Sequence, residues 1–141
     1  MRLVYLPYLI FSDSLSLKDC GAHKPRKIMH ELSLCESVLQ VLEQQAKVEN
    51  YQTVTAVYLE IGALSGVEPD AMRFCFDSVV KGSLAEKAQL EIIEIAGQAW
   101  CSACNTNVFI EQRYQSCPNC GSYPLQINDG DQMRIKQLEV A

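Results

Sequence analysis

Four cysteines, arranged as two C-x2-C pairs, constrain this chain more than any other feature. The pairs are "CSAC" at 101–104 and "CPNC" at 117–120, with twelve residues between them. Each C-x2-C turn aims two sulfurs at one point, so two turns can close a tetrahedron of thiolates around one ion. Pro118 and Gly121 favour a tight second turn. The spacing predicts a metal site, with Zn²⁺ as the expected occupant, at Cys101, Cys104, Cys117 and Cys120.

Other chemistry is compatible with the same cysteines. Competing interpretations are two disulfides, a rubredoxin-type iron centre and a thiol oxidoreductase that uses Cys101 and Cys104. A closed set of four thiolates leaves no open coordination position, which favours a structural site over a catalytic one. Cys35 and Cys75 fall within expected helices, where a small buried apolar side chain is the ordinary interpretation. Cys20 precedes the readable part of the chain.

Helical and strand patterns alternate from residue 29 onward. Ser33 and Glu36 match a capping box, and apolar residues then recur at helical spacing. Pro69 suits a first helical turn and Gly82 a helix end. The expected elements are a short strand at 29–31, a helix from Ser33 to near Asn50, a strand at 53–62, a helix at 65–83, a strand at 88–100, a short hairpin between the cysteine pairs and a strand at 132–140.

Charge separates the segment 1–28 from the rest of the chain. Residues 1–28 carry a net charge of +3, whereas residues 29–141 carry −8. An acidic body argues against binding nucleic acid through its phosphates. The apolar stretch at 3–11 is too short to span a membrane, and no small-residue cleavage site follows it. We therefore expect residues 1–28 to be a mis-assigned start and the working protein, which we place in the cytoplasm, to begin at Met29.

A start at Met29 gives His30 a special position. A free α-amine on Met29, the backbone nitrogen and imidazole of His30, and the backbone nitrogen of Glu31 can form adjacent chelate rings on one ion. Such a planar, all-nitrogen set suits Ni²⁺ or Cu²⁺. The alternative is an exposed histidine near a strand start. Only one other histidine is present, His23, so a histidine-based catalytic zinc site is excluded, and no nucleophile motif accompanies His30.

Three stretches resemble a known family. "MHELSLCESVLQVLEQQA" at 29–46, "VYLEIGALSGVEPDAMRFCFD" at 57–77 and the two cysteine pairs, in that order, resemble the HypA/HybF hydrogenase nickel-incorporation proteins. The resemblance covers 29–141 and looks closest to the HybF branch. The family pattern begins at M-H-E, whereas this chain places the segment 1–28 before it.

The resemblance implies a metallochaperone rather than an enzyme. Such proteins bind Ni²⁺ at their amino terminus and pass it to the large subunit of [NiFe]-hydrogenase, working with a HypB-type GTPase; some relatives also serve urease. No membrane or nucleic-acid partner is implied. The implied ligands are Met29, His30 and Glu31 for nickel, and Cys101, Cys104, Cys117 and Cys120 for structural zinc.

The implied fold class is α+β. A small nickel-binding domain of a three-stranded sheet and two helices would comprise 29–99 and 122–141, with a zinc-ribbon-like domain inserted at 100–121. The alternative function is a zinc-ribbon interaction module with no nickel role, which nucleic-acid binding that weakens with salt would reveal.

Overall fold

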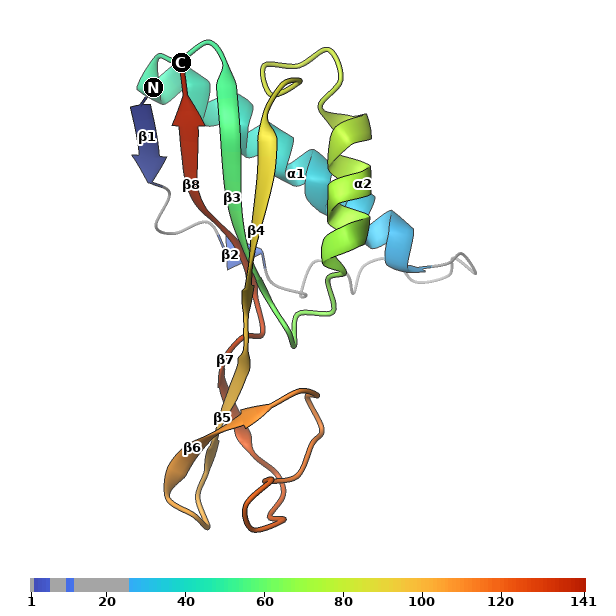
Figure 1. The fold of residues 1–141 in the computed structure, drawn as a ribbon, viewed down its shortest axis with the longest axis vertical. Coiled ribbons are helices and arrows are strands. Elements are labelled where there is room, and N and C mark those ends of the chain that lie inside the picture. Colours follow the sequence, from blue (N-terminus) through green and yellow to red (C-terminus); the bar gives the residue numbers. More distant parts are fainter. Residues whose placement is uncertain (1, 6–9, 12–25) are drawn as a thin grey trace.

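Two sheets of unequal size and two helices make up the described part of the protein. The computed structural model describes residues 2–5, 10–11 and 26–141. The segment 1–28 is therefore described only in part, and Cys20 and His23 lie outside the described residues. Figure 1 shows both helices on one face of the larger sheet, with the smaller sheet projecting from one end of it. This mixed architecture confirms the predicted α+β class.

The larger sheet has the strand order β1-β8-β3-β4. Its central strands are β3 (Val54–Gly62) and β8 (Met133–Val140), which are antiparallel. β4 (Gln89–Ile95) pairs in parallel with β3, so the connection between them has to cross over the sheet. The helix α2 (Pro69–Val79) forms that crossover. From residue 29 onward, three strands and two helices form this unit, as the family resemblance implies.

Two short strands come from the segment before residue 29. β1 (Arg2–Tyr5) and β2 (Ile10–Phe11) both pair antiparallel with β8, on the edge that β3 does not occupy. Part of the segment expected to be a mis-assigned start thus extends the larger sheet. In Figure 1 the two chain ends lie side by side, because β1 pairs with the last residues of β8.

The helix α1 (Arg26–Glu49) begins earlier than predicted. Neither the strand at 29–31 nor the capping box at Ser33 is correct, because both lie inside α1. The helix starts early because its buried face already includes Glu31. This face continues through Cys35, Val38 and Leu42, and all four side chains are fully buried. This i, i+4, i+7, i+11 spacing keeps one face of the helix against α2 and the sheet.

The main core lies between the helices and the larger sheet. Its fully buried side chains include Leu42, Leu59, Met72, Ile135 and Leu138. Cys35 and Cys75 are also buried in it, as expected of small apolar side chains. The predicted second helix is shorter than the expected 65–83, although Pro69 does begin it. Gly82 has a φ of 76° but follows the helix end by three residues.

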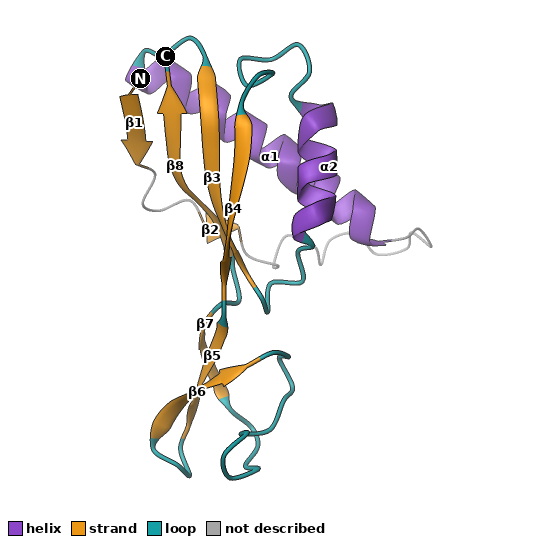
Figure 2. Cartoon of the chain, in the orientation of Figure 1, coloured by secondary structure: helices purple, strands orange, loops and turns teal. Residues whose placement is uncertain are grey.

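The smaller sheet has the strand order β6-β5-β7 and carries no helix (Figure 2). Its strands are β5 (Gly97–Cys101), β6 (Thr106–Ile110) and β7 (Gln126–Asp129). The single strand predicted at 88–100 is therefore two strands in different sheets, β4 and β5. The hairpin predicted between the two cysteine pairs is wrong, because β6, which lies between them, pairs with β5, and the first cysteine pair lies at the turn of that hairpin. Residues of this sheet extend beyond 100–121 in both directions.

The chain crosses between the two sheets at a close-packed junction. The Leu64 N–H donates to the Gly130 carbonyl at 2.8 Å, and the Ala63 N–H donates to the Ile95 carbonyl at 2.8 Å. A Cβ on Gly62 would overlap the Gly130 carbonyl, so the backbones approach too closely for any side chain there. This contact between segments distant in sequence fixes how the smaller sheet leaves the larger one.

In residues 26–141 and the short strands before them, no helix is both long and apolar enough to span a bilayer.

Candidate metal centres

The four cysteines of the two C-x2-C pairs meet at the end of the smaller sheet. Their sulfur atoms all lie within 4.8 Å of one another. Sγ of Cys101 is 3.6 Å from Sγ of Cys120, and Sγ of Cys104 is 3.8 Å from Sγ of Cys117. A tetrahedron with Zn–S bonds of about 2.3 Å has edges of about 3.8 Å. The spacing of the sulfurs thus fits one tetrahedrally coordinated ion.

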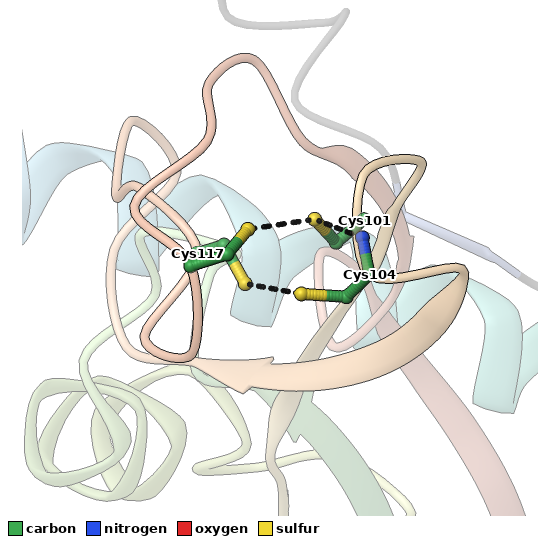
Figure 3. Close-up of side chains that lie close together, drawn as sticks. Cys101, Cys104 and Cys117 are labelled. Carbon is green, nitrogen blue, oxygen red and sulfur yellow. Dashed lines mark hydrogen bonds between the residues drawn. The ribbon is translucent and has the colours of Figure 1, made fainter.

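Local backbone geometry explains why the sulfurs converge. Cys101 ends β5, and the Cys104 N–H donates to its sulfur at 3.4 Å. In the second turn, the Gly121 N–H donates to the Cys117 carbonyl at 2.8 Å, and Gly121 has a φ of 76°. The predicted role of glycine in tightening this turn is confirmed. Figure 3 shows the side chains of Cys101, Cys104 and Cys117 pointing toward one another.

The pKa values of the Cys104 and Cys120 thiols are shifted in opposite directions. Hydrogen bonds with the side chain and backbone of Ser122 lower the pKa of the Cys120 thiol to about 6, and Ser122 Oγ lies 3.2 Å from its sulfur. A hydrogen bond with Cys120 is the main cause that raises the pKa of Cys104 to about 12. These hydrogen bonds therefore favour the thiol form of Cys104 and the thiolate form of Cys120. A soft divalent cation would displace the thiol protons on binding, because thiolates are the ligating form.

Disulfide chemistry does not fit the cluster. All four residues are free cysteines, and the 3.6 Å between the sulfurs of Cys101 and Cys120 is far longer than an S–S bond of about 2.05 Å. Cys101 and Cys117 are buried, whereas Cys104 is half-buried and Cys120 is exposed. The four cysteine sulfurs are suited to metal binding. They would fill all four coordination positions of a tetrahedral ion, so none would remain for a substrate.

The expected nickel ligands lie in the first turns of α1. Met29, His30 and Glu31 are helical, and the His30 side chain is half-buried. In an α-helix each N–H bonds to the carbonyl four residues earlier. With the helix beginning at Arg26, the nitrogens of His30 and Glu31 are within reach of such carbonyls. The backbone here is thus arranged for helix hydrogen bonding rather than for chelation.

Glu31 also has a structural contact that sequence reasoning did not find. Its side chain is fully buried, and Oε1 accepts a hydrogen bond from the Glu68 N–H at 3.1 Å. Glu68 is the N-cap of α2 but makes no side-chain cap of its own. The Glu31 carboxylate therefore supplies the cap from another helix, where the helix dipole favours a negative charge. Among the described side chains, Glu31 Oε2 is buried without a hydrogen-bond partner.

A weak sequence signal existed for this contact. The start of α2 reads Glu68-Pro69, with no Ser, Thr, Asp or Asn at the cap position, so its orphan N–H groups need an acceptor from elsewhere.

The two expected metal sites, for nickel and for zinc, remain separate in the structure. Within the described residues, the four cysteines form a group that could hold a metal ion, and neither His30 nor Glu31 belongs to it.

Comparison with known proteins matches most of the chain to one family. The family model described as hydrogenase/urease nickel incorporation, metallochaperone, HypA, matches residues 29–140. A hydrogenase maturation factor HypA from Azotobacter chroococcum is 54% identical over 112 residues, covering 79% of this chain and 99% of the relative. One from Azotobacter vinelandii is 51% identical with the same coverage.

Solved structures agree with the sequence relatives. The solution structure of the Ni metallochaperone HypA from Helicobacter pylori is 25% identical, with a TM-score of 0.58, covering 78% of this chain and 96% of that one. Another HypA solution structure has a TM-score of 0.61 at 25% identity, covering 80% and 97% of the two chains. This chain therefore belongs to the HypA family of hydrogenase/urease nickel-incorporation metallochaperones.

Proposed function

We propose that this protein binds Ni²⁺ at Met29, His30 and Glu31 and delivers it to the large-subunit precursor of a [NiFe]-hydrogenase. A HypB-type GTPase is the proposed partner in delivery. The observation that carries the proposal is that the match to a nickel-incorporation family begins at Met29, with a histidine as the next residue. That position gives the histidine an imidazole and a backbone nitrogen next to a potential α-amine.

Helix physics supports a working chain that begins at Met29. The first four N–H groups of a helix have no intrahelical partner. In a chain starting at Met29, the nitrogens of His30 and Glu31 belong to those orphan groups and are available to a metal. Residues 1–28 replace the amine with an amide and supply carbonyls at Arg26 and Lys27 that compete for the same N–H groups. We therefore assign the nickel-binding form to a chain without residues 1–28.

The Glu31 side chain supports this site indirectly. Because its carboxylate is held against the Glu68 N–H, the first turn of α1 is anchored to the start of α2. The backbone nitrogen of Glu31 then has a defined position relative to the half-buried His30. A site of this kind at a chain end is shallow, so an acceptor with further ligands can remove the ion by stepwise exchange.

We propose Zn²⁺ as the resident ion of the four-cysteine cluster. Cys101, Cys104, Cys117 and Cys120 supply four soft ligands at distances suited to a tetrahedral ion. When bound, zinc would cross-link two loops of the 100–121 segment and has no further chemical role here. The proposed nickel-binding domain is the larger sheet with its two helices; it is smaller than the expected 29–99 and 122–141, because β5 and β7 belong to the smaller sheet. Reduced thiols are consistent with a cytoplasmic setting.

Calorimetric titration with Ni²⁺ tests the nickel site. Three proteins are compared: the full-length chain, the chain starting at Met29, and the latter with His30→Ala. We expect tight one-to-one binding only for the unmodified chain starting at Met29, and at least about a hundredfold loss for His30→Ala because the imidazole donor and the chelate ring that it closes with the backbone are both lost. Metal analysis of the same samples is expected to give one zinc per chain in all three.

Ser33→Ala in the chain starting at Met29 is the matched control. Ser33 is exposed on the same helix and should leave nickel binding unchanged. Equal nickel affinity of the His30→Ala variant would refute the assignment. Iron in place of zinc, visible as a charge-transfer absorption band, would refute the proposed resident metal.

A further inference from the structure

The outer edge of β8 is covered by a strand from outside the family match. β1 pairs antiparallel with β8 in the register Arg2–Val140, Leu3–Glu139, Val4–Leu138 and Tyr5–Gln137. The opposite edge of β8 is taken by β3 (Figure 1). The matched region, 29–140, contains β8 but not β1. Without β1, this stretch of β8 would present backbone N–H and C=O groups with no strand beside them.

Two side chains of β1 contact the body of the protein. Val4 is only 6% exposed and packs into the main core, whereas its neighbours Leu3 and Tyr5 are 47% and 65% exposed. The Arg2 guanidinium donates a hydrogen bond to the backbone carbonyl of Glu49, the last residue of α1. Carbonyls at a helix C-terminus carry partial negative charge and attract cations. In β1, the residue that contacts the helix end is cationic, and the residue two positions later is apolar and buried.

Charge favours the same kind of segment. The body from residue 29 onward carries a net charge of −8, and the strand that lies on it comes from a segment of net charge +3. Backbone pairing to a sheet edge supplies affinity, and the pockets for alternate side chains supply specificity. Here the buried core position that Val4 takes opposite Leu138, and the carbonyl of Glu49, supply the two side-chain contacts.

We propose that the outer edge of β8 is a strand-accepting surface for an extended segment of a partner protein with the pattern cationic residue, any residue, apolar residue, and that residues 2–5 occupy it as an internal mimic. The partner segment lies antiparallel to 137–140, with its apolar side chain in the place of Val4. This surface involves neither the four cysteines nor His30, so it does not rest on the proposed metal chemistry.

Competition in the full-length chain tests the surface. An internal strand has an effective concentration of order millimolar, so a free peptide binds poorly unless that strand is weakened. The probe is a fluorescent peptide of residues 1–5, titrated against the wild-type chain, Val4→Asp and Leu3→Asp. We expect Val4→Asp to bind the peptide at least about tenfold more tightly than the wild type. Leu3→Asp, altered at an exposed position of the same strand, should match the wild type.

Backbone NMR locates the bound peptide. Amide shift changes at 137–140 in the Val4→Asp chain, together with weak binding of a peptide whose Arg2 is replaced by Glu, are the expected results. Val4→Thr, which keeps the side-chain shape, replaces Val4→Asp if circular dichroism shows that the latter has unfolded. Peptide binding equal to that of the wild type would overturn the proposal. So would dimerisation of the variant through 137–140 that excess peptide does not reverse, because the edge would then accept a second copy.

Discussion

Cys35 lies one turn after Glu31 on α1, and its sulfur is enclosed between the two helices. Sγ of Cys35 is 3.5 Å from the Met72 carbonyl oxygen and 3.9 Å from the Met72 sulfur. Burial, followed by the nearby Cys75 and the Glu31 carboxylate, raises the pKa of the Cys35 thiol to about 12. The sequence indicated that this cysteine would be buried, but Met72 and Cys75 came to lie beside it only through the packing of α1 against α2.

This thiol should make stability depend on pH in the alkaline range. In the unfolded chain Cys35 loses its proton near pH 9, whereas in the folded chain it does so near pH 12. The unfolded state therefore binds fewer protons between these values, and the free energy of unfolding falls as pH rises, by up to about 4 kcal/mol from this group. Stability contributed by the neutral thiol is fully present below pH 9.

Urea unfolding between pH 7.5 and 10.5 measures the effect. Burial also raises the pKa of Tyr51 to about 12, so the wild-type slope contains both groups. Cys35→Ala removes one of them, and the difference between the two slopes isolates the thiol. Parallel slopes for the two proteins would show that Cys35 ionises as easily in the folded chain as in the unfolded one.

At the scale of elements, the break between β4 and β5 decides the shape of the protein. The residue pattern alone predicts one strand over 88–100, because the residues before and after the break between β4 and β5 both have a strand pattern. The chain instead changes sheets at Ala96–Gly97, where it packs against two other crossings at Gly62 and Gly130. A Cβ on Gly97 would lie 2.6 Å from the Ile110 carbonyl oxygen. Such backbone contacts between distant segments leave only a glycine in the sequence as a signal.

Gly62→Ala should therefore destabilise the junction. The new methyl group would overlap the Gly130 carbonyl, which belongs to backbone and cannot rotate away. We expect a loss of about 3 kcal/mol in the free energy of unfolding, at the upper end of overpacking costs. Gly66→Ala is the control: Gly66 has a φ of 77° and open space around it, so the loss should be about 1 kcal/mol from backbone strain alone. Equal losses in thermal or urea unfolding would show that space at Gly62 is not limiting.

At the scale of the whole molecule, the two sheets have separate cores. The smaller core contains few buried residues, and two of them are metal-ligand candidates; its members are Leu64, Ala99, Cys101, Val108, Ile110 and Cys117. One further contact is a hydrogen bond of 2.8 Å, which the Arg113 Nε–H donates to the Leu64 carbonyl. A core of this size is too small to stabilise three short strands on its own.

Removing the metal should therefore loosen the smaller sheet and leave the larger one intact. After chelation, or in Cys104→Ser, we expect amide hydrogen exchange to accelerate across 97–129 while β3 and β8 keep their protection. Mass-spectrometric exchange on the same preparation before and after chelation measures both regions at once. Equal acceleration in β3 and β8 would mean that the two sheets unfold as one unit.

The sequence by itself determined the features that depend on local spacing. Four cysteines at C-x2-C-x12-C-x2-C spacing converge because each turn is closed by its own backbone, and the alternating pattern of β8 follows from burial of one face. Tertiary structure alone decided the early start of α1, the Glu31 cap on α2 and the pairing of β1 with β8. Each of these depends on a partner distant in the chain, and such partners become neighbours only once the sheet and helices have packed.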